Sequence, residues 1–152
     1  MTKKKELQVR AIKNGTVIDH IPAELLFKVI NMLELDKCPT AVTIGSNYRS
    51  DMLGKKGIIK ISEKFFADDE INKISLIAPN AKLNIIRDYQ VIEKRVVEVP
   101  NKVEGIVKCM NPKCITNVED VFTKFKVMSK SPITLKCHYC EKITDEKNIR
   151  IK

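Results

Sequence analysis

The sequence predicts an α+β protein with a mainly antiparallel sheet and two helices over residues 1–100, followed by a small all-β domain over residues 101–152. Strand-like and helix-like segments alternate in the first part. Pro100 cannot continue a strand ladder except at an edge, and four of the five cysteines come after it. A domain boundary is therefore expected at residue 100.

The chain begins with two strand-like segments, residues 7–12 and 16–21, on either side of the turn signal Asn14-Gly15. Pro22 suits the first turn of a helix, and apolar residues then recur at helical spacing. These features predict a helix over residues 23–35 that packs its apolar side on a sheet.

Two further strands are predicted at residues 40–45 and 57–62, and the polar segment 46–56 between them predicts a mobile loop. A second helix is expected from Asp68 onward. Acidic residues open it, isoleucines continue it at helical spacing, and Pro79 ends it.

The last strands of the first part are predicted at residues 82–87 and 90–97. Strand pairs therefore alternate with single helices. This order is typical of a ferredoxin-like, split β-α-β sandwich, in which both helices cover one face of a mainly antiparallel sheet.

The second part is too short to bury a large apolar core without support. Its strand-like segments are residues 121–127 and 133–136. Its paired cysteines, in a C-x4-C-x22-C-x2-C pattern, are Cys109, Cys114, Cys137 and Cys140. Two such pairs present four sulfurs to one ion, so the pattern predicts one bound Zn²⁺, with disulfides or separate buried thiols as the alternative.

Four thiolates close the tetrahedral shell of zinc and leave no position for an activated water. The predicted zinc is therefore structural, not catalytic. His138, between Cys137 and Cys140, is expected to face solvent, and Cys38 is expected to be a loop thiol or a partly buried thiol of the first part.

The chain is basic, with 28 Lys and Arg against 19 Asp and Glu, a formal net charge of +9. Such an excess favours phosphate-bearing partners, so a nucleic-acid-associated zinc-ribbon protein is one alternative. Aromatic residues make up only 5% of the chain and the basic residues are scattered, which disfavours that alternative.

No apolar run approaches the ~20 residues of a membrane span, and no apolar signal segment follows the basic first residues. A cytoplasmic protein without a membrane partner is expected. The sequence lacks G-x-S-x-G and G-x-G-x-x-G, and Gly54-Lys55-Lys56 does not complete a phosphate-binding loop. Asp19-His20 is a weak acid–base candidate because neighbours on a strand point to opposite faces. These features predict a protein that is not an enzyme.

Lysines on the predicted strands indicate a candidate binding face. Lys56 and Lys60 share one face, about 13 Å apart. If the later strands lie beside them, that face also includes Asn84, Ile86, Tyr89, Val91 and Lys94. Such a face would suit a small polyanion with a ring, whereas solvated edge lysines are the alternative.

Several segments of the chain form a recognisable set, most specific in the string from Gly15 to Pro22 and in the cysteine spacing. They are Leu7-Gln8-Val9, Gly15-Thr16-Val17-Ile18-Asp19-His20-Ile21-Pro22, Thr43-Ile44-Gly45, Ile59-Lys60-Ile61, Ala78-Pro79, Asn84, Tyr89 and Cys137-His138-Tyr139-Cys140-Glu141-Lys142. From about residue 6 to its end, the chain resembles the aspartate carbamoyltransferase regulatory chain family.

The resemblance implies a non-catalytic subunit in pyrimidine biosynthesis, with an allosteric nucleotide-binding domain at residues 1–100 and a zinc-binding domain at residues 101–152 that docks on a catalytic chain. In this family, regulatory chains form homodimers that bridge two catalytic trimers. CTP inhibits, ATP activates, and UTP can act with CTP. The same effectors and partners are expected here.

The resemblance also implies roles for individual residues, with Cys109, Cys114, Cys137 and Cys140 as the zinc ligands. The base would contact Val9, Ala11, Ile12 and Tyr89, the ribose would contact Asp19 and Lys60, and the phosphates would lie by His20, Val91 and Lys94. The residues that complete the pocket or help a second nucleotide would be Val17, Lys56, Asn84 and Ile86. Arg10 and the segment Tyr48-Arg49-Ser50-Asp51 depart from the family pattern, so the effect of each nucleotide stays open.

Overall fold

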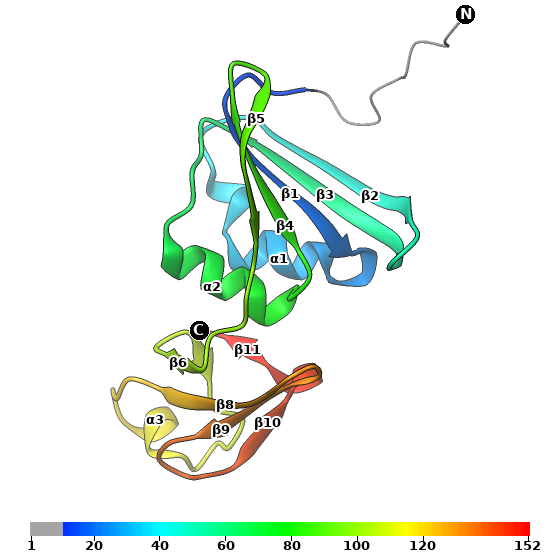
Figure 1. Cartoon of the computed structure of the whole chain (residues 1–152). Helices are drawn as coiled ribbons and strands as arrows, with labels where there is room; N and C mark the ends of the chain where they lie inside the picture. The colour runs from blue at the N-terminus through cyan, green and yellow to red at the C-terminus, as the bar shows by residue number, and fades with distance from the viewer. Residues whose placement is uncertain (1–10) are drawn as a thin grey trace, which may run out of the picture.

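The computed structural model describes residues 11–152, and its first part is built around one five-stranded sheet (Figure 1). The strands are β1 (Gly15–Pro22), β2 (Val42–Ser50), β3 (Gly54–Ser62), β4 (Lys82–Arg87) and β5 (Gln90–Val96). Their order across the sheet is β2-β3-β1-β4-β5, and all neighbours are antiparallel. The predicted α+β architecture is confirmed.

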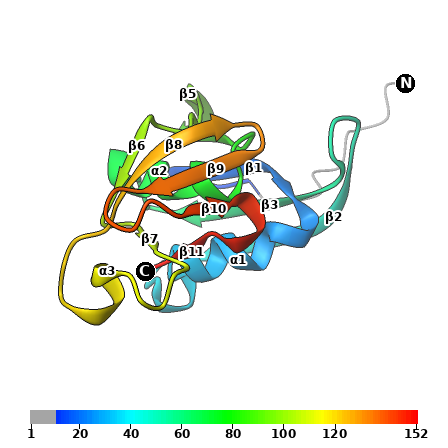
Figure 2. The same ribbon diagram turned by 90° about the horizontal axis from the view of Figure 1, so that it is seen from below.

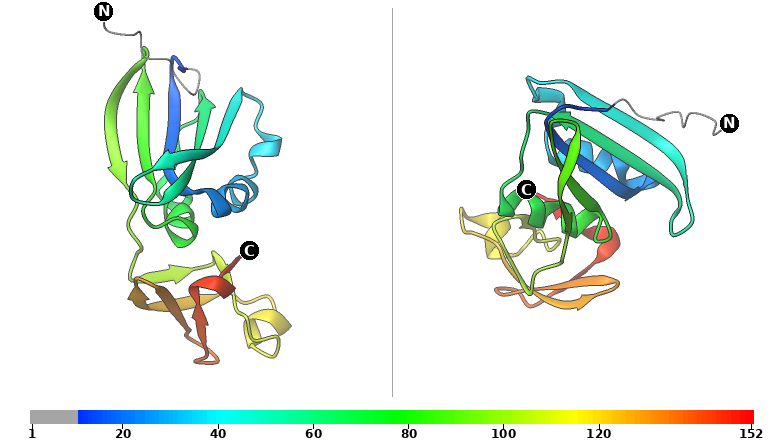
Figure 3. Two further views of the ribbon diagram at one scale, coloured as in Figure 1. Left: turned by 90° about the vertical axis from the view of Figure 1, so that its right-hand side faces the viewer. Right: turned by 45° about the horizontal axis from the view of Figure 1, so that its top comes forward.

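Helices α1 (Leu26–Met32) and α2 (Asp68–Ile77) cover one face of this sheet (Figure 3). Side chains alternate along the strands, so every second one is buried under the helices. Ile18, Ile59 and Leu83 are fully buried in a core that also contains Ile74 of α2. The opposite face of the sheet, here called the open face, carries no helix from residues 11–152.

Helix α2 begins at the predicted residue, Asp68. Glu70 closes its first turn, because its carboxylate accepts a hydrogen bond from the Ala67 backbone N–H at 3.3 Å. Acidic residues at this end also stabilise the helix dipole. Helix α1 is shorter than the predicted 23–35, since residues 23–25 form a 3-10 turn and Glu34 has a φ of 51°. The apolar spacing thus extends beyond the helix itself.

The predicted loop at residues 46–56 is wrong. Strand β2 continues to Ser50 and β3 begins at Gly54, with Tyr48 opposite Lys56 and Arg49 opposite Lys55. Polar residues pair in this extension of the hairpin, so no apolar alternation marks it in the sequence. Of the predicted strand at residues 7–12, Ala11 and Ile12 lie outside any strand, and the other positions lie outside the described residues.

The second part is a small β domain with two sheets (Figure 2). One has the order β10-β9-β8-β6, from β6 (Lys102–Glu104), β8 (Lys124–Lys130), β9 (Ile133–Cys137) and β10 (Ile143–Asp145), and the other pairs β7 (Val107–Lys108) with β11 (Arg150–Ile151). The predicted strand at 121–127 starts too early, because residues 121–123 belong to the loop after the one-turn helix α3 (Ile115–Val118).

Residues 11–152 contain two apolar cores, and α2 contributes to both. Val103, Phe125 and Leu135 belong to the second core. Leu76 of α2 also belongs to it and is only 1% exposed, whereas its neighbour Ile77 belongs to the first core. Helix α2 therefore packs on the sheet with one side and on the second part with another. No helix within residues 11–152 has the length and apolar character needed to cross a membrane.

Candidate functional site

The four paired cysteines meet in the second part, although the two pairs are far apart in the sequence. Cys109 follows β7, Cys114 precedes α3, Cys137 ends β9, and Cys140 lies in the turn before β10. All four Sγ atoms lie within 4.8 Å of one another. Cys109 and Cys140 are 3.6 Å apart at their sulfurs, and Cys114 and Cys137 are 3.7 Å apart.

This spacing fits one tetrahedral metal ion, because four sulfurs at about 2.3 Å from a central zinc lie about 3.8 Å from one another. Two polar side chains hold the first pair in place. Thr116 Oγ1 donates a hydrogen bond to Cys114 Sγ at 3.2 Å, and Asn117 Nδ2 donates to the carbonyl oxygens of Cys109 and Asn111 at 2.8 and 2.7 Å. The cysteine spacing alone does not predict Thr116 or Asn117, although their place directly after Cys114 is a usable signal.

The local environment shifts the pKa values of the four thiols in different directions. Burial raises the pKa of the Cys109 thiol to about 12. Burial also acts to raise the pKa of Cys140, but hydrogen bonds from the Lys142 backbone and the Asn111 side chain outweigh it and lower the pKa to about 7. A bound divalent cation deprotonates such thiols outright, so metal binding must release protons.

His138 and Cys38 take no part in the cluster. The His138 ring stands edge-on to Tyr139, with ring centroids 5.0 Å apart, and its backbone N–H donates to the Lys124 carbonyl. Cys38 packs against the first core and lies 3.2 Å from Thr40 Oγ1. Among the described residues, the metal-ligating cluster consists of the four paired cysteines.

Four of the other candidate residues form a row on the open face of the first sheet. Val17 of β1 lies opposite Lys60 of β3 and Asn84 of β4, and Asn84 lies opposite Lys94 of β5. Lys60 is half-buried, and burial lowers the pKa of its amine. The row thus has one lysine at each end, with the apolar side chain of Val17 and the amide of Asn84 between them.

A second group surrounds a β-bulge of β1 between Ile18 and Ile21. The bulge gives His20 a φ of 61°. Asp19 and His20 therefore do not point apart as simple strand alternation predicts, and His20 Nδ1 lies 3.4 Å from Asp19 Oδ2. The Nζ atom of Lys56 lies 3.0 Å from Asp19 Oδ1. A carboxylate, an imidazole and an amine thus meet at one end of the face.

A third group lies at the other end, around the turn between β4 and β5. Tyr89 is 66% exposed there, and its backbone N–H donates to the Lys13 carbonyl at 2.9 Å. This bond holds Tyr89 against the segment that contains Ala11 and Ile12. Ile86 lies opposite Gly15, and Val91 lies opposite Ile86. Val9 lies outside the described residues.

The three groups share one face and cover a short distance, since Gly15 and Asp19 are about 13 Å apart along β1. The register adds two residues that the sequence does not single out. Lys82 lies opposite Asp19, and Val96, which is 65% exposed, lies opposite Lys82. They lie two residues along their strands from Asn84 and Lys94, so their side chains point to the same face. This alternation, which is readable in the sequence, is the signal that could have found them.

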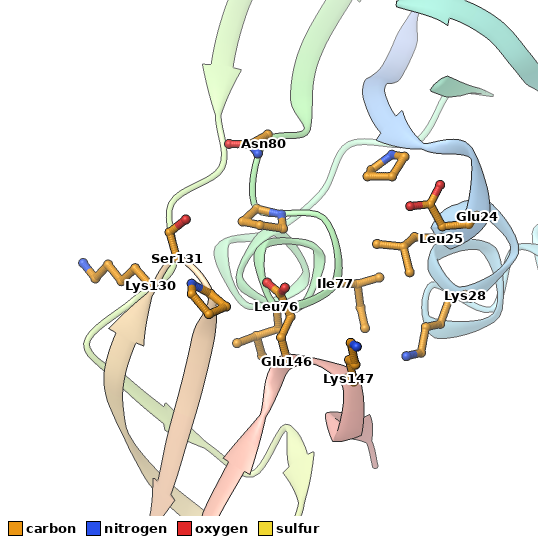
Figure 4. Close-up of a pocket in the computed structure, with 13 residues that line it drawn as sticks. Glu24, Leu25, Lys28, Leu76, Ile77, Asn80, Lys130, Ser131, Glu146 and Lys147 are labelled. Carbon is orange, nitrogen blue, oxygen red and sulfur yellow. The ribbon is translucent and has the colours of Figure 1, made fainter. Parts of the chain in front are cut away.

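A pocket of about 730 Å³ lies between the two parts of the chain (Figure 4). Leu76 and Ile77 of α2 lie beside it. Lys28 approaches from α1, and Glu146 and Lys147 approach from the 3-10 turn before β11. Of the described residues, none that is predicted to hold a nucleotide or a metal lines this pocket.

Two family models match the sequence. Residues 7–98 match the allosteric domain of the aspartate carbamoyltransferase regulatory chain, and residues 101–150 match the metal-binding domain of the same chain. A regulatory chain from Parabacteroides distasonis is 55% identical over 150 residues, covering 99% of this chain and 97% of the relative. One from Bacteroides fragilis is 57% identical over 148 residues, covering 97% of each chain.

A more distant organism, Pyrococcus abyssi, has a regulatory chain that is 53% identical over 146 residues, covering 95% of this chain and 96% of the relative. All of these relatives are named as regulatory chains, in agreement with the prediction of a non-catalytic protein. The chain belongs to the aspartate carbamoyltransferase regulatory chain family, with an allosteric domain followed by a metal-binding domain.

Proposed function

We propose that this chain is a cytoplasmic regulatory subunit that binds nucleoside triphosphates and passes their effect to the catalytic chains of aspartate carbamoyltransferase. Residues 1–100 bind CTP as an inhibitor, ATP as an activator, and UTP together with CTP. Residues 101–152 hold one Zn²⁺ and dock on the catalytic chain. The observation that carries the nucleotide part is the row of Lys60, Val17, Asn84 and Lys94 on an open sheet face.

Zinc is the proposed metal because all four ligands are thiolates. Sulfur ligands at tetrahedral spacing suit zinc, whereas magnesium and calcium prefer oxygen. Four thiolate ligands fill the coordination shell of the ion and leave no place for a substrate. The ion therefore supports the second core and the two cysteine-bearing turns at its surface. Its role is structural.

The nucleotide would lie across the open face between the Tyr89 end and the Asp19 end. This binding position is here called the nucleotide seat. Tyr89 with Ala11 and Ile12 offers an aromatic ring and backbone groups for the base. Lys60 and Lys94 lie on strands three positions apart in the sheet, about 14 Å between backbones, so Lys60 can reach the ribose while Lys94 reaches the phosphates. Asp19 offers an acceptor for ribose hydroxyls.

Replacing Lys60 tests this seat. Lys60→Met is expected to weaken ATP and CTP binding alike by about 10- to 100-fold, because it removes one charge-assisted contact to a group that both ligands share. Isothermal titration of the zinc-loaded chain measures this. Lys55→Met is the matched control: it is on the same strand with opposite parity, is exposed, and should bind nucleotides normally. Equal affinities for the two variants would contradict the proposed seat.

A single seat also requires that ATP and CTP compete. A nucleotide shifts a two-state assembly only by its differential affinity for the two states, so activator and inhibitor must couple oppositely to one equilibrium. Titration of ATP into the CTP-saturated chain should show an apparent affinity lowered in proportion to the CTP present. Independent binding of the two would refute the shared seat.

Two surfaces support the proposed assembly. Strand β2 is an edge of the first sheet. Ile44 of this strand and Met52 in the turn after it are exposed by 43% and 64%, which suits pairing with a second regulatory chain. Beside the first cysteine pair, Met110, Val118 and Phe122 are exposed by 48%, 67% and 77%. Such an apolar patch on a metal-stiffened turn suits docking on the catalytic chain. Helix α2 connects the first part of the chain with the second through Leu76, which belongs to the second core.

A further inference from the structure

The outward face of the four-stranded sheet in the second part carries three lysines side by side. Lys102 of β6 lies opposite Lys126 of β8, and Lys126 lies opposite Lys136 of β9. Val103, Phe125 and Leu135, their neighbours along the strands, point into the second core. The three side chains, here called the lysine row, therefore share one exposed face across three adjacent strands.

The lysine row lacks ion-pair partners among the residues that the structure describes. Directly opposed like charges destabilise a sheet. None of the three lysines forms an ion pair with any residue from 11 to 152. The next pair on the same face, Glu104 opposite Lys124, brings opposite charges into register, in contrast to the lysine row. The repulsion in the lysine row is consistent with a partner that supplies the missing negative charge.

The lysine row lines a hollow of about 610 Å³ whose wall also includes Glu104, Lys124, and His138 and Glu141 beside the second cysteine pair. Ile143 of β10 lies opposite Lys136 and continues the row, with 49% of it exposed. The hollow thus has four lysines against two acids, with one exposed apolar side chain beside it, and it reaches the turn of the second cysteine pair.

We propose that the lysine row binds an acidic helix on the surface of the catalytic chain, as a second contact beside the apolar patch near the first cysteine pair. This rests on the proposed docking of residues 101–152. Adjacent strands are about 4.8 Å apart, so the row repeats at about the 5–6 Å that separates acidic side chains at i and i+4 on a helix. An acidic helix laid across the strands matches three lysines in turn.

A protein partner accounts for the face better than a nucleic acid. Ile143 gives an apolar contact that a phosphate backbone does not use, and the aromatic residue next to the row, Phe125, is only 2% exposed and cannot stack on bases. Salt-sensitive association with the catalytic trimer is the expected property.

The substitution Lys126→Glu tests the proposal with two readouts of opposite sign. In the free zinc-loaded chain, a glutamate between Lys102 and Lys136 replaces two repulsions by two attractions, so the melting temperature should rise by about 1–3 °C. In the complex, the same change should weaken binding to the catalytic trimer by about 10-fold or more at low salt, and the loss should shrink as NaCl is added. A purely structural role for the row would move both readouts in the same direction.

Lys55→Glu is the matched control. It makes the same change in net charge and also relieves a like-charged pair, with Arg49, but it lies in the first part. It should leave trimer binding unchanged. Trimer binding by Lys126→Glu within 2-fold of the unsubstituted chain would overturn the lysine row as a contact, while metal-dependent docking would still stand. If Lys126→Glu instead abolished binding of single-stranded RNA and left trimer binding intact, the face would be assigned to nucleic acid and the proposal would be overturned.

Discussion

Removal of the metal is expected to unfold the second core and release the chain from its catalytic partner. Metal binding in a small domain contributes about 10–16 kcal/mol of apparent free energy, comparable to or larger than the net stability of a whole domain. Cys137→Ser should act in the same way, since Cys137 is fully buried, ends β9 and contacts Cys114. Far-UV circular dichroism after chelation, followed by size-exclusion chromatography with the catalytic trimer, measures both effects.

Cys38→Ser is the control for the thiol chemistry. Cys38 lies outside the cluster, in the first part, and the change should cost no more than about 1 kcal/mol and leave metal content at one ion per chain. A chelated chain that still co-elutes with the trimer would show that docking does not depend on the metal-held turns.

Leu76→Ala is expected to weaken the connection between the two parts as well as the stability of the chain. Leu76 is 1% exposed in the second core although it belongs to a helix of the first part. Truncating a buried leucine costs about 2–5 kcal/mol. In the complex, the response of aspartate saturation to ATP and CTP should shrink. Nucleotide affinity should be retained because, within residues 11–152, none of the apolar candidate residues of the seat belongs to the second core or packs against it.

Ile74→Ala separates stability from communication. Ile74 is on the same helix and fully buried, but it belongs to the first core. It should lose a similar amount of stability and keep the nucleotide response of the complex. If both variants lose that response equally, general destabilisation explains the effect and Leu76 has no special part in it.

The elements that alternate clearly between apolar and polar residues could be predicted from the sequence, and the others could not. Strand β4 is where the pattern places it, and α2 starts at the acidic residues that stabilise a helix N-terminus. The extension of the β2–β3 hairpin escaped prediction because both faces of it are polar. Strand β8 was shifted because the β-branched residues Val121 and Thr123 continue its pattern upstream into a loop.

The metal cluster was predictable for a physical reason that does not apply to the nucleotide seat. Four cysteines at short paired spacings have few other uses in a reducing compartment, whereas lysines on strands are common. The register of five strands decides which lysines share a face, and register depends on pairing between distant segments. The bulge that turns His20 toward Asp19 could not be predicted, because neither glycine nor proline lies between Ile18 and Ile21 to mark it in the sequence.

The shared use of α2 limits how far the chain can be treated as modular. A fragment that ends at Pro100 would carry Leu76 as an uncovered apolar side chain, and the remaining fragment would lack one wall of its core. Ile151, near the end of the chain, packs against both cores and crosses the same boundary in the other direction. A chimera that joins the allosteric half of one relative to the metal-binding half of another should therefore fold well only when residues 76 and 151 come as a compatible pair.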